Sequence, residues 1–150
     1  MDLDNVDYHE IARRGDVEVM DVFLTAGLDV NLTNTRGHSL LMIASYNHQP
    51  EMARLLLAHG ADPNQPDASG STPLMGTVFK GDIELAALLL EAGADVRAVN
   101  GAGATALHFA AMFRQAPLAE LLLSHGADAE ARDGMGRRPA DLGPLSDSPA

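Results

Sequence analysis

The chain has 150 residues and a formal net charge of −11 at pH 7, and 46% of its residues are hydrophobic but only 4% aromatic. Nucleic acids and anionic membranes attract proteins through basic groups, so this acidity argues against both as partners. The absence of cysteine excludes disulfides and thiol catalysis. Together with the lack of a secretory leader and of any apolar run of ~20 residues, it leads us to expect a cytoplasmic protein.

Two series of glycines recur along the chain at a spacing of 33 residues. One series is Gly27, Gly60, Gly93 and Gly126, and the other is Gly37, Gly70, Gly103 and Gly136. A fixed period of this length is typical of repeat architectures, in which each copy packs only against its neighbours. We therefore expect four copies, at about 4–36, 37–69, 70–102 and 103–135.

The first copy, 4–36, begins with a polar stretch and has Asp7 and Tyr8 where the third copy has a Pro-Leu step. A terminal copy must shield the stack from water, and polar residues suit that position. We therefore expect this copy to form the N-terminal end of the stack.

The third copy shows the internal plan most clearly. Thr72 and the proline after it are a good N-cap and first residue for a helix over 73–80. Asp82 is a good N-cap for a second helix over 83–91, and Gly93 is placed to end that helix in the left-handed conformation. Each copy is therefore expected to be a pair of short helices.

The second and fourth copies repeat this plan, with Ser39 and Thr105 as the caps of their first helices. Between helix pairs, the segment 94–104 contains Asn100-Gly101, which is typical of a tight hairpin turn. The sequence therefore predicts β-hairpin fingers that lead from one copy to the next.

A fifth unit begins at 136–142 as Gly-Arg-Arg-Pro-Ala-Asp-Leu and then stops at Gly143-Pro144, which cannot continue a helix. We interpret 136–142 as a capping half-repeat that completes a domain over 1–142. The remaining residues, 143–150, are expected to form a disordered tail.

The repeated unit, which reads G-x-T-P-L-x-x-A followed by E-x-x-x-L-L-L-x-x-G-A-D, resembles the ankyrin repeat over about residues 4–142. The resemblance implies an all-α repeat fold, an ankyrin solenoid of four helix pairs with β-hairpin fingers and a short C-terminal half-repeat cap. It also implies a concave groove, formed by the ends of the first helices and the finger tips, at which partner proteins dock.

Residues that vary between copies at this groove are the candidates for partner binding. Two adjacent columns of the superposed copies, together with two finger arginines, supply Arg13, Arg14, Tyr46, Asn47, Phe79, Lys80, Met112, Phe113, Arg36 and Arg132. Aromatic residues, methionine and arginine are enriched at protein interfaces, so this set predicts a binding surface. The alternative is that the same side chains pack against neighbouring fingers and complete the core.

The histidines do not predict a metal site, and we expect no metal, no cofactor and no catalytic residue. His59 and His125 occupy the same column two copies apart, ~20 Å from each other, so one ion could not bind both. His108 lies in Thr-Ala-Leu-His, which resembles the ankyrin Thr-Pro-Leu-His; there the ring links neighbouring repeats by hydrogen bonds. Of the equivalent positions, the first copy keeps a histidine, and Met42 and Met75 replace it in the middle copies.

The predicted function is a non-enzymatic module that binds a partner protein as its regulator, adaptor or neutraliser. Residues 41–48 and 70–81 resemble small bacterial ankyrin-repeat proteins, some of them encoded beside catalase genes, which implies a stress-defence accessory role as one alternative. The 136–142 element also resembles the short cyclin-dependent-kinase inhibitors, although their second repeat has a shortened helix and 39–47 looks full-length. Self-association through the thinly capped C-terminal end is a further alternative to the expected monomer.

Overall fold

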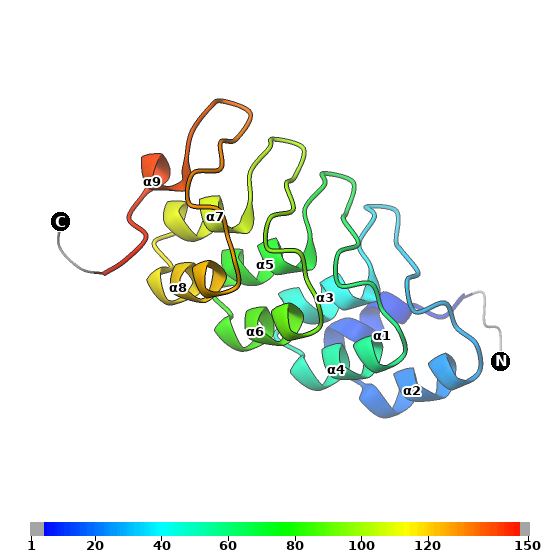
Figure 1. The fold of residues 1–150 in the computed structure, drawn as a ribbon. Helices are drawn as coiled ribbons and strands as arrows, with labels where there is room; N and C mark the ends of the chain where they lie inside the picture. Colours follow the sequence, from blue (N-terminus) through cyan, green and yellow to red (C-terminus); the bar gives the residue numbers. More distant parts are fainter. Residues whose placement is uncertain (1–4, 148–150) are drawn as a thin grey trace.

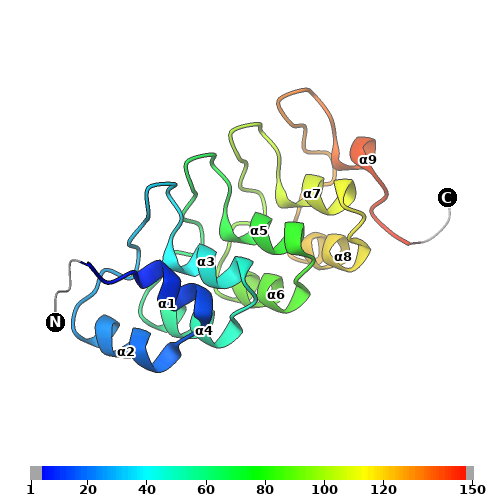
Figure 2. The ribbon, with the colours of Figure 1, turned by 180° about the vertical axis from the view of Figure 1, so that it is seen from behind.

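A computed structural model describes residues 5–147 of the chain, and its helices form two parallel rows (Figure 1). The inner row consists of α1 (Tyr8–Arg14), α3 (Leu40–Tyr46), α5 (Pro73–Lys80) and α7 (Ala106–Met112). The outer row consists of α2 (Val17–Thr25), α4 (Pro50–Ala58), α6 (Ile83–Glu91) and α8 (Ala116–Ser124). A single turn, α9 (Pro139–Leu142), follows at the C-terminal end, and loops project from the inner row as fingers (Figure 2). The predicted all-α solenoid is confirmed.

The helix pair of the third copy begins and ends as its sequence predicts. The Thr72 hydroxyl accepts from the backbone N–H of Met75 at 3.4 Å, and a carboxylate oxygen of Asp82 accepts from that of Leu85 at 3.2 Å. Gly93 has φ 97°, the left-handed conformation that a glycine adopts without strain. Local capping chemistry therefore fixes α5 and α6 before any packing is considered.

The fingers differ from the predicted β-hairpins, because residues 5–147 contain no strand and only one isolated antiparallel bridge, between Thr33 and Ser39. The reason is local. In the third finger, Oδ1 of Asn100 accepts from the backbone N–H groups of Ala102 and Ala104 at 2.9 and 3.0 Å. A side chain that occupies these donors leaves the loop as a turn rather than as a strand ladder.

Neighbouring copies share their core. Leu85 and Leu89 of α6 are buried in the cluster that extends to the first copy, whereas Leu90 of the same helix is buried in the cluster that extends to the last. One helix therefore contributes to two clusters, so the third copy is stabilised by both of its neighbours.

The C-terminal end is covered more completely than predicted. Helix α9 packs against α7, and the backbone N–H of Arg138 donates to the Asp141 carboxylate at 2.8 Å. Leu145 then packs, partly buried, against the last core cluster. Residues 143–147 continue from α9, and the disordered tail expected over 143–150 stays a prediction. The rest of that tail, 148–150, and the polar start at 1–4 lie outside the described residues.

None of the helices in the described part of the chain combines the length and the apolar character needed to cross a membrane.

Candidate functional site

A row of aromatic rings crosses three copies at the ends of the inner helices. Tyr46 ends α3, Phe79 lies in the last turn of α5, and Phe113 follows α7. The Tyr46 and Phe79 rings stack with centroids 6.1 Å apart, and Phe79 meets Phe113 edge-on with centroids 5.3 Å apart. The three residues are nevertheless 40%, 52% and 39% exposed. We call Tyr46, Phe79 and Phe113 the aromatic row.

A groove of about 480 Å³ lies between the aromatic row and the fingers. Met42 and Met75, both buried, and Gly76 of α5 contribute to its lining. The complete lining is Arg36, His38, Met42, Ile43, Tyr46, Asp67, Ser71, Thr72, Met75, Gly76, Phe79 and Phe109. The groove is therefore mainly apolar along the helices and polar at the fingers.

Asp67, the acidic residue in the groove lining, accepts hydrogen bonds within its own finger. Its Oδ1 accepts from the backbone N–H groups of Ser69 and Ser71 at 2.9 and 3.0 Å, and the His38 ring lies 3.6 Å from its Oδ2. Burial acts to raise the pKa of Asp67, but the hydrogen bonds and the nearby imidazole outweigh it and hold that pKa below its usual value. Asp67 therefore remains an anion whose oxygens already have donors.

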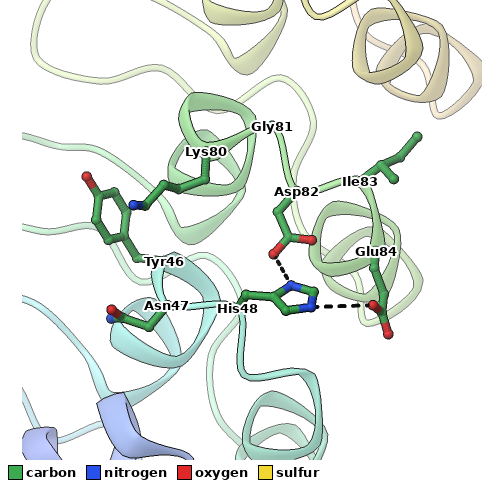
Figure 3. A pocket seen from close by; sticks show the side chains of 8 residues that line it. All are labelled: Tyr46, Asn47, His48, Lys80, Gly81, Asp82, Ile83 and Glu84. Carbon is green, nitrogen blue, oxygen red and sulfur yellow. Dashed lines mark hydrogen bonds and ion pairs between the residues drawn. The ribbon is translucent and has the colours of Figure 1, made fainter.

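A second hollow, of about 670 Å³, also includes Tyr46 in its lining (Figure 3). The Lys80 ammonium lies 4.5 Å from the centroid of the Tyr46 ring, a cation–π geometry. At the far side, Nδ1 of His48 lies 2.5 Å from the Asp82 carboxylate. That hydrogen bond, with the charge of Asp82, raises the pKa of His48. The same carboxylate caps α6, so His48 joins the second copy to the third.

The repeat pattern, the two rows of helices and the groove agree with a comparison to known families. A family described as ankyrin repeats (3 copies) matches residues 8–100 and 69–133. The chain is an ankyrin-repeat protein. Ankyrin repeats are generally protein–protein interaction modules and typically not enzymes. A search of curated proteins finds no significant match.

Some of the predicted binding residues lie together at the groove and the aromatic row. The aromatic row and Lys80 form one continuous surface, and Arg36 lines the groove beside it. Met112, at the end of α7, is 43% exposed next to Phe113. These residues lie at the ends of the inner helices and at a finger, and their role in partner binding stays a prediction.

Other predicted residues lie apart from the groove lining. Arg13 pairs with Glu10 on its own helix, with Nε 2.6 Å from a carboxylate oxygen, and Arg14 is exposed at the end of α1. Asn47 lines the second hollow. Arg132 donates to the backbone carbonyl of Gly136 at 2.8 Å within the last finger.

Sequence reasoning missed several residues of the groove. Phe109, which is not among the predicted binding residues, is only partly buried, stacks on Phe113 with centroids 6.2 Å apart and lines the groove. Ile43 and Gly76 occupy the same column as Phe109 in the two preceding copies and also line it. The signal that could have identified them is the variation in that column.

The histidine links predicted for the ankyrin repeats are present at both ends of the stack. Nε2 of His108 donates to the backbone carbonyl of Arg137 at 2.8 Å, and His9 makes the equivalent contact with the carbonyl of His38 at 2.9 Å. In the middle copies, Met42 and Met75 pack at these positions, buried beneath the groove. Within residues 5–147, no three metal-ligating side chains gather into a group that could hold an ion.

Proposed function

We propose that this ankyrin-repeat protein is a non-enzymatic binding module that holds a partner protein on its concave face, at the aromatic row and the adjoining groove. The observation that carries the proposal is that three rings touch one another across three copies and still remain 39–52% exposed. Isolated exposed apolar residues are ordinary, whereas a contiguous apolar row beside a groove marks an interaction surface.

The energetics of interfaces favour this surface over the rest of the chain. Aromatic side chains bury a large area for a small loss of conformational freedom, and a few such residues usually carry most of the binding free energy. The row is also held in place, because Tyr46 stacks on Phe79 and receives Lys80 on its ring. A surface that is already ordered loses little entropy when a partner covers it.

The outer helices supply a matched control. Val19 and Val22 of α2 and Leu123 of α8 are 39%, 67% and 37% exposed, comparable with the aromatic row, but they lie on the opposite row of helices. Their replacement by alanine removes exposed apolar surface without touching the groove.

The test is an affinity capture from native lysate with three baits: the wild type, Tyr46→Ala/Phe79→Ala/Phe113→Ala, and Val19→Ala/Val22→Ala/Leu123→Ala. We expect a protein that is retained by the wild type and by the outer-helix variant and lost from the aromatic-row variant. Equal retention by all three folded baits would contradict the concave face as the binding surface.

Whether binding regulates, tethers or neutralises the partner, and whether the role is in stress defence, stay predictions. Self-association through the C-terminal end has less support than the groove, because α9 packs against α7 and Leu145 packs on the last core cluster. We therefore propose a monomer that acts through its concave face.

A further inference from the structure

Gly76, in the middle of α5, is a glycine that neither the backbone nor the packing requires. The φ angle of Gly76 is not positive, and a Cβ added there would meet only Cδ2 of Tyr46, at an ordinary contact distance of 3.6 Å. A glycine inside a helix lowers its stability relative to alanine. Local structure therefore gives no reason for a glycine at this position.

The neighbouring copies have a large side chain at the position that Gly76 occupies in α5. Ile43 and Phe109 stand at the equivalent positions of α3 and α7, so α5 has a gap where its neighbours have large side chains. Gly76 lines the groove with the stacked rings of Tyr46 and Phe79. We call this gap, bordered by Tyr46, Phe79 and the buried Met75, the Gly76 socket.

Two cations lie beside the socket, although the molecule as a whole carries −11. Arg36 lines the groove at the fingers, and Lys80 lies on the Tyr46 ring, in the lining of the second hollow. Neither cation has an ion pair with an acid of the described residues. The acid in the lining, Asp67, is engaged by Ser69, Ser71 and His38.

We propose that the Gly76 socket receives one large apolar side chain from an extended segment of a partner protein, and that carboxylates flanking this side chain pair with Arg36 and Lys80. The inference rests on the proposed function and names the chemistry of the partner. The socket supplies apolar walls and space for one side chain, and the cations beside it supply charge complementarity for acidic neighbours.

Nucleic acid is a less suitable occupant of the groove than an acidic peptide segment. Aromatic rows can stack bases, but such sites are embedded in a basic surface that follows the phosphate backbone. Here the molecule is acidic overall, and the second hollow beside Tyr46 includes Asp82 and Glu84. An isolated carboxylate next to an apolar side chain fits this arrangement better than a chain of phosphates.

The experiment selects ligands without assuming a partner. A displayed library of random dodecapeptides is selected on the wild-type protein, and the enriched peptides are measured against Gly76→Leu and Arg36→Glu/Lys80→Glu. We expect enriched peptides to carry Leu, Ile, Met or Phe with Asp or Glu on both sides, and each variant to weaken their binding at least about tenfold.

Stability separates a filled socket from a damaged fold. Because Gly76→Leu replaces a glycine within a helix, it is expected to raise the melting temperature by about 2–4 °C while it weakens binding. Ala58→Leu, at an exposed position of α4, adds a similar side chain outside the groove and should leave binding unchanged. If Gly76→Leu does not fold, Gly76→Ala provides the same comparison with a smaller side chain.

The outcomes distinguish this inference from the function on which it rests. Enriched peptides without acidic residues, unchanged binding to Gly76→Leu, the absence of any enriched peptide, or tight binding of oligo-dT would each overturn the inference. If enriched peptides bind both charge and socket variants normally but fail to bind Phe79→Ala/Phe113→Ala, the concave face still binds a partner and only the socket assignment is wrong.

Discussion

At the residue scale, one finger position shows how different side chains perform the same task. Asn34, Asp67, Asn100 and Asp133 are spaced 33 residues apart, and Oδ1 of each accepts two backbone N–H groups of its own finger. The amide and the carboxylate are therefore interchangeable as acceptors. They differ because only the carboxylate can be protonated in acid.

This difference predicts the response to acid. The pKa of Asp67 is lowered from 3.8, so the folded state favours its anion, and the resulting stabilisation is present above that value and lost as the pH falls through the lowered pKa. Asp67→Asn should unfold like the wild type at pH 7 and lose less stability below pH ~4. Asn100→Asp should unfold like the wild type at pH 7 and lose more stability than the wild type below pH ~4. Thermal melts from pH 7 to pH 2 measure both, and identical profiles for all three proteins would refute the argument.

His108 carries a second residue-scale prediction. The ring is fully buried; its Nδ1 accepts from the Thr105 N–H at 3.1 Å, so its Nε2 bears the proton that it donates to Arg137. His108→Met introduces the methionine that the middle copies have at this position, but it leaves the Thr105 N–H and the Arg137 carbonyl without their hydrogen-bond partner. We expect a loss of about 1–3 kcal/mol in the free energy of unfolding, measured by urea denaturation. An unchanged midpoint would show that the link contributes nothing.

At the scale of the element, the two glycine series that look alike in the sequence have different roles. Gly93 has φ 97° and open space around an added Cβ, so only its backbone conformation requires glycine. Gly70 has φ 82°, and an added Cβ would also lie 2.9 Å from the backbone nitrogen of Gly101 in the next finger. One series therefore ends helices, and in the other Gly37, Gly70 and Gly103 allow fingers to approach one another.

Alanine substitutions should separate these roles. Gly93→Ala is expected to cost about 1–2 kcal/mol, the penalty for a side chain in the left-handed conformation. Gly70→Ala should cost more, because the methyl group also displaces the neighbouring backbone. Equal melting temperatures for the two variants would mean that the fingers move apart freely.

At the scale of the whole molecule, the C-terminal cap completes the stack. Each copy is stabilised by its neighbours, and beyond the last copy the described residues comprise α9 and the segment with Leu145. Removal of 136–150 takes away the Arg137 carbonyl that His108 contacts and uncovers apolar surface of α7.

We expect the truncated protein to melt at a lower temperature than the wild type and to associate at micromolar concentration, whereas the full chain stays monomeric. Analytical ultracentrifugation and thermal melts of the two proteins measure this. A full-length dimer that the truncation dissolves would instead place an interface at the cap and support self-association.

The repeat and the bounds of the helices follow from the sequence alone. They do so because capping residues, glycines and leucine spacing act within one copy, and because a fixed period carries the plan of α5 and α6 to the other copies. In the third finger, Asn100 occupies backbone donors that hairpin pairing would need, and residues 5–147 contain one isolated bridge where strands were expected.

Which side chains meet depends on the packing of successive copies. Contact between Tyr46, Phe79 and Phe113, the place of Phe109 in the groove and the anchoring of Leu145 depend on how successive copies are rotated and spaced. The same is true of the Gly76 socket. Within its own copy, Gly76 has no distinctive feature. It becomes part of the groove wall only because side chains of the two neighbouring copies lie on either side of it.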